Sequence, residues 1–163
     1  ISVLEAREDK ENNEIYYVLE KKPDFNVGDE VELKIDWQKR YNIMKLHSAA
    51  HVVNEIFSKK TRIAKSIGSN VTSEKARLDY ETENPVSEFL PEIEEEANKI
   101  FSENHPIEIE EKEDKTRIWK SMNIEIPCGG THVKNLNEIG KIKLKRKNIG
   151  KGKERIEITL VEE

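Results

Sequence analysis

Two pairs of residues carry side chains suited to bind a metal ion. His47 and His51 lie four residues apart, and Cys128 and His132 repeat that spacing across a Gly-Gly turn. On a helix, residues four apart share one face, so both imidazoles can reach the same ion. Glycine accepts the backbone angles of a tight turn, which lets the second pair fold back onto one point. Three nitrogen donors and one sulfur suit Zn²⁺ better than Mg²⁺ or Ca²⁺, so we predict one zinc ion per chain.

Each pair also has an explanation without a metal. Two histidines on one helix face are often just half-buried, and a lone cysteine is usually a small buried apolar residue. The stretch HSAAH lacks the glutamate of H-E-x-x-H, so it is not the metalloprotease signature. The conjunction favours a metal, because three of the four histidines and the only cysteine fall into these two pairs. The remaining histidine, His105, is assigned no role.

The elements that must position these residues follow from the apolar pattern. Apolar residues recur every three or four positions after Trp37, which predicts a helix ending near Lys59 and Lys60. A second amphipathic helix is predicted from about Leu90 to Ser102. Strands are predicted at Ile1–Ala6, Glu14–Glu20, Lys65–Val71, Lys75–Tyr80, Ile107–Glu111, Thr116–Met122, Lys141–Lys145 and Arg155–Val161, with a further strand through Val31, Leu33 and Ile35. This order predicts an α+β fold, mainly antiparallel sheet packed against two helices.

The strands expected before residue 37 offer too little material to stand alone. We therefore expect residues 1–36 to be a partial N-terminal β domain, the remnant of a small β-barrel-like domain whose upstream part is absent from this chain. Residues 37–163 then form the domain that carries the candidate metal ligands.

Composition excludes several classes of protein. The chain has 163 residues, of which 35% are hydrophobic and 37% charged, and this length can bury a real core. No apolar run approaches the roughly 20 residues that a membrane helix needs. The single cysteine excludes an internal disulfide and fits a reducing compartment, so we expect a cytoplasmic protein. ATP-driven chemistry is disfavoured because no G-x-x-x-x-G-K-[ST] loop is present.

The net charge of −5 conceals a strong segregation of charge. Residues 81–114 contain thirteen acids and two lysines, whereas residues 141–155 contain eight bases and one acid. Such a basic segment can hold RNA locally, because screening limits charge effects to about 8–10 Å. It can equally be the solvated face of a hairpin whose lysines protect an edge strand. The RNA-binding candidates are Lys141, Lys143, Lys145, Arg146, Lys147, Lys151, Lys153 and Arg155.

The order of motifs resembles that of a known family. H-x-x-x-H at His47 and His51, followed much later by C-G-G-T-H-V from Cys128, resembles the editing domain of alanyl-tRNA synthetase and its free-standing AlaX relatives. The threonyl synthetase editing domain shares the histidine pair, but a Gly-Pro-His ending is expected there. The resemblance covers about Val27 to Arg155. It extends to Val27-Gly28-Asp29, Ile35-Asp36-Trp37, Arg40-Tyr41, Ile67-Gly68-Ser69, Ala76-Arg77-Leu78-Asp79-Tyr80 and Ile126-Pro127.

The resemblance implies a tRNA-editing domain over residues 37–163. In this family the domain hydrolyses the ester that links a wrong amino acid, mainly serine and sometimes glycine, to alanine tRNA. By the same resemblance His47, His51, Cys128 and His132 hold zinc, and tRNA is the partner. The chain departs from its relatives in two ways: it lacks a glycine-rich P-G-G-G-Q-P segment, and Ala50 stands where threonine often precedes the second histidine.

Selectivity for serine over alanine requires polar groups in the pocket, because a size filter would exclude the larger serine. The candidates for substrate binding are Ser69, Arg77, Asp79 and Thr131, and Asp79 and Thr131 are also the candidate catalytic residues. Arg77 and Asp79 can instead form an ordinary ion pair, and Thr131 can merely cap a turn. Four protein ligands would close a tetrahedral zinc site, so either one ligand is loose or zinc only orients the substrate amino group.

Three functions remain open from the sequence. The first is a trans-acting hydrolase for mischarged alanine tRNA. The second is a non-catalytic RNA-binding module in which zinc only links the helix to the turn. The third is a cis-editing fragment of a full synthetase; the hairpin at the C-terminal end favours the free-standing form.

Overall fold

The computed structural model describes residues 1–9, 11–12, 14–63, 66–82, 85–150 and 152–161. The first residue of one predicted strand, Lys65, and the RNA-binding candidate Lys151 lie outside the described residues. The chain divides into two compact units, Ile1–Lys34 and Ile35–Glu163.

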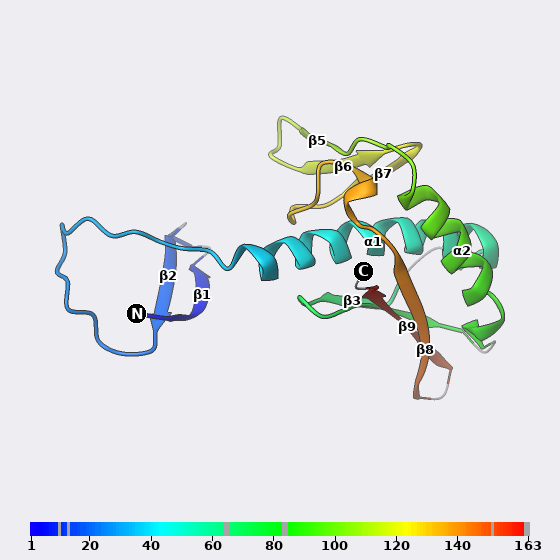
Figure 1. Ribbon diagram of the computed structural model, residues 1–163, viewed down its shortest axis with the longest axis horizontal. Helices are drawn as coiled ribbons and strands as arrows, with labels where there is room; N and C mark the ends of the chain where they lie inside the picture. Colours follow the sequence, from blue (N-terminus) through cyan, green and yellow to red (C-terminus); the bar gives the residue numbers. More distant parts are fainter. Residues whose placement is uncertain (10, 13, 64–65, 83–84, 151, 162–163) are drawn as a thin grey trace. The chain divides into compact units, whose positions relative to one another are not determined.

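The N-terminal unit contains one antiparallel hairpin, formed by β1 (Val3–Asp9) and β2 (Glu14–Leu19), as predicted (Figure 1). The predicted third strand through Val31, Leu33 and Ile35 is wrong, because these residues have no strand structure and are at least half exposed. Alternation of apolar and polar residues describes a strand only when a neighbouring strand supplies the hydrogen bonds.

The C-terminal unit is built around the long helix α1 (Trp37–Thr61), which begins and ends close to the predicted positions. Asp36 caps its N-terminus by accepting a hydrogen bond of 3.0 Å from the Lys39 backbone N–H. The predicted apolar stripe of α1 is largely buried, including Leu46 and Phe57, which are both fully inaccessible. The predicted second helix is confirmed as α2 (Leu90–Phe101), and it packs beside α1. A short 3-10 helix, η1 (Val86–Glu88), precedes α2.

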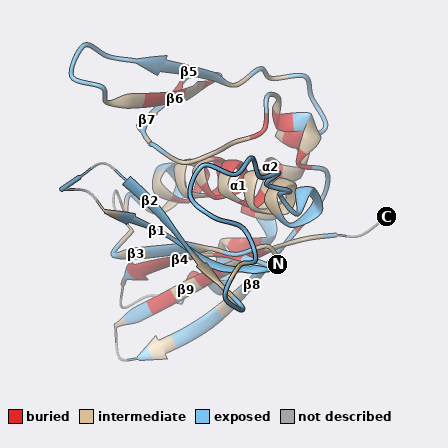
Figure 2. Cartoon of the chain, turned by 90° about the vertical axis from the view of Figure 1, so that its left-hand side faces the viewer, coloured by how far each residue is buried: buried red, intermediate tan, exposed pale blue. Residues whose placement is uncertain are grey.

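One face of the helices is covered by a four-stranded antiparallel sheet in the order β3-β4-β9-β8 (Figure 1). Its strands are β3 (Gly68–Val71), β4 (Ala76–Glu81), β8 (Ile142–Gly150) and β9 (Lys153–Leu160). Along β4, Leu78 and Tyr80 are buried and point toward the helices, where Tyr80 packs against Phe57 of α1. Figure 2 colours the buried residues of the chain red. Side chains alternate along a strand, so Arg77 and Asp79 occupy the opposite face, which we call the outer face.

A three-stranded antiparallel sheet in the order β5-β6-β7 lies on the other side of α1. It contains β5 (Glu108–Glu111), β6 (Arg117–Ser121) and β7 (Ile124–Pro127). Strand β7 was not predicted, because it has only four residues and ends in a proline. The backbone N–H of Cys128 donates to the carbonyl of Arg117 over 2.8 Å, so the cysteine directly continues the β6–β7 ladder.

The fold is α+β, with antiparallel sheet packed against two α-helices, and this prediction is confirmed. A short 3-10 helix, η2 (Leu136–Glu138), joins the second pair of candidate ligands to β8. Among the described residues, no helix combines the length and the apolar character needed to cross a membrane.

Candidate metal centre and adjoining cavity

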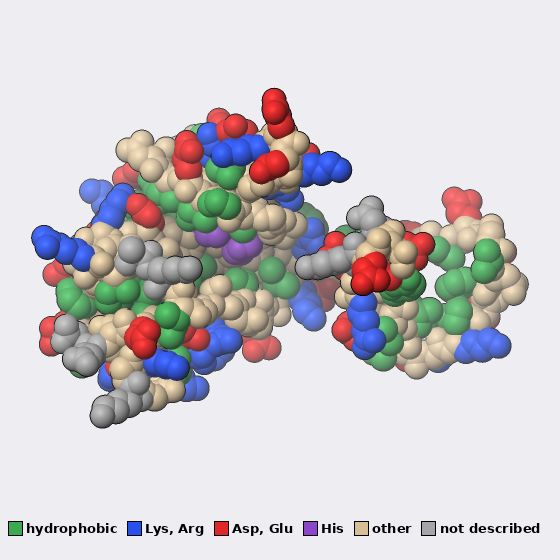
Figure 3. Space-filling model, turned by 180° about the vertical axis from the view of Figure 1, so that it is seen from behind, with side chains coloured by type: hydrophobic (Ala, Val, Ile, Leu, Met, Phe, Trp, Pro, Cys, Tyr) green, Lys and Arg blue, Asp and Glu red, His purple; other side chains and the backbone are tan. Residues whose placement is uncertain are grey.

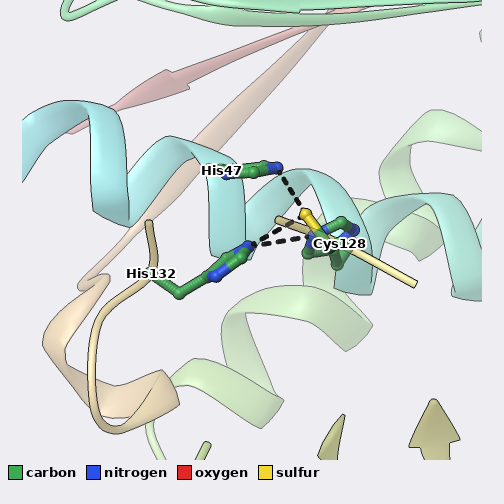
Figure 4. Close-up of side chains that lie close together, drawn as sticks. His47, Cys128 and His132 are labelled. Carbon is green, nitrogen blue, oxygen red and sulfur yellow. Dashed lines mark hydrogen bonds between the residues drawn. The ribbon is translucent and has the colours of Figure 1, made fainter. Parts of the chain in front are cut away.

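The four predicted metal ligands come together in the folded chain. His47, His51, Cys128 and His132, which we call the metal cluster, place their ligand atoms within 4.8 Å of one another. Figure 4 shows His47, Cys128 and His132 directed toward one another from α1 and from the loop after β7. In Figure 3 histidine side chains lie in a recess bordered by hydrophobic side chains. Sequence pairs 81 residues apart, such as His51 and His132, therefore converge on one point.

The distances within the metal cluster suit a tetrahedral ion. Cys128 Sγ lies 3.4 Å from His47 Nε2 and 3.6 Å from His132 Nε2, and the Nε2 atoms of His51 and His132 are 3.1 Å apart. A tetrahedral zinc ion would give N···N edges of about 3.3 Å and N···S edges of about 3.6 Å, from its usual bond lengths. These three separations are close to the tetrahedral values, and all separations in the cluster are within 4.8 Å, so the donor set fits zinc once the ligands close on the ion.

Burial keeps the three imidazoles neutral, which is the form that binds a metal. Desolvation lowers the pKa of His47, although a hydrogen bond to the Thr131 backbone acts in the opposite direction. Desolvation, together with the nearby His47, lowers the pKa of His51 to about 4. The pKa of His132 falls to about 3, mainly through desolvation and then through His47, His51 and Arg117. Its Nδ1 is buried without a hydrogen-bond partner in the described part of the chain.

The loop from Cys128 to His132 needs one of its two glycines for space. A Cβ on Gly130 would lie 2.3 Å from His47 Cε1, whereas a Cβ on Gly129 would meet nothing within 4 Å. Neither glycine has a positive φ, so the predicted reason, conformational freedom, is wrong. The close approach of the backbone to the His47 ring requires glycine at this position instead. Since the Thr131 backbone accepts a hydrogen bond from this ring, His47 presents Nε2 to the metal cluster.

A hydrogen-bond chain ties the segment after His132 to α1. Tyr41 on α1 donates to Glu138 Oε2 over 2.7 Å. Glu138 Oε1 in turn accepts from the backbone N–H groups of Lys134 and Asn135, each over 2.8 Å. Burial, and then the Glu138 carboxylate, raise the pKa of Tyr41 to about 12, so the phenol remains a donor. This chain fixes the position of His132 relative to the histidines of α1.

Arg117 is a residue of this region that the sequence reasoning missed. Its Nη1 donates to the carbonyl of Gly129 over 3.1 Å, and its charge contributes to the low pKa of His132. No local motif marks it, because its place beside the loop depends on the pairing of β6 with β7.

A cavity of about 390 Å³ adjoins the metal cluster, with His47 and His51 in its wall. The rest of the wall comes from α1, from β3 and the segment leading into it, and from single residues of β4 and β7. Most of these side chains are apolar or small, and the predicted substrate-binding residue Ser69 is among them. The further lining residues are Ala50, Asn54, Ser66, Ile67, Gly68, Val71, Leu78 and Ile126.

The other predicted substrate-binding and catalytic residues do not line this cavity. Asp79 accepts two bonds from Arg155, of 2.6 and 2.9 Å, and one of 2.7 Å from Arg77. This ion-pair network lies on the outer face, since Leu78 between them faces the cavity. The alternative of an ordinary ion pair therefore describes the observed arrangement. Thr131 touches the metal cluster through its backbone, by its bond to His47.

The predicted RNA-binding segment is only partly available to a partner. Three of its bases are engaged in ion pairs: Lys143 with Glu94 (2.7 Å), Arg146 with Glu154 (2.6 Å) and Arg155 with Asp79 (2.6 Å). Lys151 lies outside the described residues. Four lysines have no ion pair to another described residue within 4.0 Å: Lys141, Lys145, Lys147 and Lys153.

Comparison with known proteins assigns the chain to a class of domain found in proteins that act on tRNA. Residues 121–157, which include the loop with Cys128 and His132, match the family model of the threonyl and alanyl tRNA synthetase second additional domain. The alanyl-tRNA editing protein AlaX-M of Pyrococcus horikoshii is 39% identical over 166 residues, covering 98% of this chain and 75% of that protein. The chain belongs to the AlaX-M family of alanyl-tRNA editing proteins.

Other relatives show how this domain is distributed. The AlaX-M protein of Saccharolobus solfataricus is 34% identical, covering 98% of this chain and 76% of that protein. The alanine–tRNA ligase of Methanococcus aeolicus is also 34% identical over 92% of this chain, but only 19% of that enzyme is covered. The same kind of domain thus occurs both in small editing proteins and within a much longer ligase.

Proposed function

We propose that this chain is a trans-editing hydrolase that deacylates mischarged alanine tRNA, with Ser-tRNA(Ala) as its main substrate and Gly-tRNA(Ala) as a possible second one. The observation that carries the proposal is the metal cluster in the wall of a cavity, in a chain that belongs to the alanyl-tRNA editing family. We assign the activity to residues 37–163, and residues 1–36 to a separate N-terminal β unit. A tRNA substrate and a free thiol are consistent with action in the cytoplasm.

The proposed cofactor is one zinc ion, held by His47, His51, Cys128 and His132. The fit rests on the N₃S donor set, on its near-tetrahedral distances and on the neutral imidazoles. When bound, zinc supplies a Lewis acid at the cavity wall, suited to orient or polarise the aminoacyl group.

The remaining chemistry is undemanding, because an aminoacyl ester is already activated. Water adds to the ester carbonyl carbon, the bond from that carbon to the ribose oxygen breaks, and the ribose oxygen takes the proton. The products are a free amino acid and a tRNA with a free 3′ end. The chain contributes by holding the aminoacyl group in the cavity, where apolar walls such as Val71, Leu78 and Ile126 limit its orientations.

The tRNA body would be held by bases that are not already paired within the chain. Lys141, Lys145, Lys147 and Lys153 meet this condition, whereas Arg146 and Arg155 are committed to Glu154 and Asp79. Their contacts would be to phosphate groups, which are sequence-independent and sensitive to salt.

The decisive experiment compares the deacylation of Ser-tRNA(Ala) by the wild-type chain and by the double variant His47→Ala/Cys128→Ala. We expect loss of bound zinc and a fall in rate of more than about 100-fold, since even partners of metal ligands cost 10–100-fold. His105→Ala is the matched control, because this histidine pairs with Glu103 and lies outside the metal cluster. Equal rates in wild type and double variant would overturn the proposal.

One observation keeps a second function open. Four protein ligands can fill a tetrahedral zinc and leave no position for a reactant. In that case the chain is an RNA-binding module in which zinc links α1 to the loop after β7. Chelation would then unfold the domain and abolish tRNA binding, while the wild-type protein would show no turnover of any aminoacyl-tRNA.

A further inference from the structure

Two polar residues in the wall of the cavity beside the metal cluster, Asn54 and Ser66, lie outside the motifs of the sequence. Asn54 lies on α1 three residues after His51 and seven after His47, so all three side chains share one face of the helix. All three also line the cavity. Asn54 is half-buried, so part of its side chain is accessible at this face.

The orientation of the Asn54 amide is fixed by a hydrogen bond from the buried Tyr80. Tyr80 on β4 is fully buried against Phe57, with ring centroids 4.1 Å apart, and its hydroxyl donates to Asn54 Oδ1 over 2.9 Å. A buried phenol needs an acceptor, and burial also raises the pKa of Tyr80, so this proton stays in place. The amide oxygen is therefore committed to Tyr80, and the two donors on Nδ2, which have no partner among the residues that the structure describes, can bind a group in the cavity.

The other polar side chains of the wall are less suited to contact a bound side chain. The hydroxyl of Ser66 donates to the Gly68 carbonyl over 2.7 Å and accepts from the Gly68 N–H over 3.2 Å, so it is used within its own turn. Ser69 is exposed to solvent. A hydrogen bond at an exposed position discriminates poorly, because water replaces it when the ligand lacks the partner group.

We propose that Asn54 is a specificity-determining residue that donates from Nδ2 to the side-chain hydroxyl of the seryl group on mischarged alanine tRNA, and that Tyr80 is its positioning residue. This assignment rests on the proposed function and specifies how its substrate is selected. An alanyl or glycyl group offers no oxygen at that point and leaves the donors of Asn54 unpaired, which disfavours its binding. The site thereby selects the larger side chain without a steric filter.

The test measures the deacylation rates of Ser-tRNA(Ala) and Gly-tRNA(Ala) side by side. In Asn54→Ala we expect the seryl rate to fall about tenfold, the usual value of one neutral hydrogen bond, while the glycyl rate is unchanged or rises. Tyr80→Phe should lower the same ratio by a smaller factor of about threefold, because the amide loses its fixed orientation. Asn70→Ala is the matched control, since Asn70 is exposed on β3 and does not line the cavity.

Several outcomes would overturn the assignment. An unchanged ratio of seryl to glycyl rates in Asn54→Ala would do so, as would a ratio that changes in Ser69→Ala instead. An equal fall in both rates would show that Asn54 contacts a group common to all substrates. If Asn54→Ala does not fold, Asn54→Leu/Tyr80→Phe removes both polar groups together, and the same ratio decides. A wild-type chain that hydrolyses neither ester would instead refute the proposed function.

Discussion

Polar side chains on the two faces of the four-stranded sheet differ in how many of their hydrogen-bonding groups have a partner within the described chain. On the outer face, the carboxylate of Asp79 is fully engaged by Arg77 and Arg155. On the face toward α1, the next residue, Tyr80, engages only one side of the Asn54 amide and leaves its donors toward a cavity. Asp79 and Tyr80, which are adjacent in β4, thus have different roles. A polar group whose partners all lie within the chain stabilises the fold, whereas one with unused donors beside a cavity can bind a ligand.

The same contrast applies to the basic hairpin of β8 and β9. Arg146 and Glu154 satisfy each other through two bonds of 2.6 Å. Lys145 and Lys147, on either side of Arg146, are exposed and project from the opposite side of the strand. A count of positive charges along this segment therefore overstates what is available to an RNA backbone.

The largest effect should come from breaking the ion-pair network of the outer face. In Asp79→Ala, Arg77 and Arg155 lose their shared partner, and the free energy of unfolding should fall by roughly 2 kcal/mol, given the partial exposure of both arginines. Urea unfolding of the wild-type and variant proteins measures this loss. At a temperature where both are folded, the rate of Ser-tRNA(Ala) deacylation should be unchanged. A variant that keeps its stability but no longer deacylates Ser-tRNA(Ala) would assign Asp79 to catalysis. The proposed difference between the two faces of the sheet would then be wrong.

Replacing basic side chains that have no ion pair within the described chain should lower the affinity for tRNA several-fold, whereas replacing a paired lysine should change it less. In Lys145→Ala/Lys147→Ala, each lost phosphate contact should lower the slope of log affinity against log salt by about 0.7–0.9. Binding titrations of alanine tRNA at several salt concentrations measure this slope. Lys143→Ala is the control, because its ammonium pairs with Glu94. Equal slopes in all three proteins would mean that tRNA docks elsewhere.

The smallest effect concerns the tie between α1 and the segment after His132. The pKa of Tyr41 is about 12 in the folded chain, whereas the pKa of a tyrosine in the unfolded chain is near 10. The folded state thus binds more protons in this range, so the stability from Tyr41 is complete below pH 10 and is lost as the pH rises toward 12. Tyr41→Phe should reduce this alkaline loss and cost about 1 kcal/mol at neutral pH.

Thermal or urea unfolding between pH 8 and pH 11 would measure the effect of Tyr41. Tyr80, whose pKa burial also raises, should leave a residual alkaline loss in the variant. A variant with the same pH dependence as the wild type would show that the hydrogen bond from Tyr41 to Glu138 does not cause the alkaline loss of stability.

The sequence predicted those parts of the molecule whose signals are local. The two helices followed from apolar periodicity, and the convergence of His47, His51, Cys128 and His132 followed from residue types that are rare elsewhere in the chain. The zinc assignment and the substrate-binding roles stay predictions. The pattern through Val31 and Leu33 failed as a strand because it has no pairing neighbour in the described chain.

Features that depend on tertiary packing were out of reach. Asn54 resembles any polar residue on a helix until Tyr80, 26 residues away, is seen to orient it. The role of Arg117 depends in the same way on the pairing of β6 with β7. Asp79 and Arg77 were placed correctly on one face of a strand, but the sequence could not show which face borders the cavity.

Gly129 and Gly130 are chemically identical neighbours, yet only Gly130 lies against an imidazole. Among natural variants or in a saturation library, the first position should accept alanine and the second should not. One additional methyl group, with no change of charge or polarity, would suffice to displace His47 from the other three residues of the metal cluster. The space between the Gly130 backbone and the His47 ring is too small for one more carbon atom, so this space decides which residues position 130 accepts.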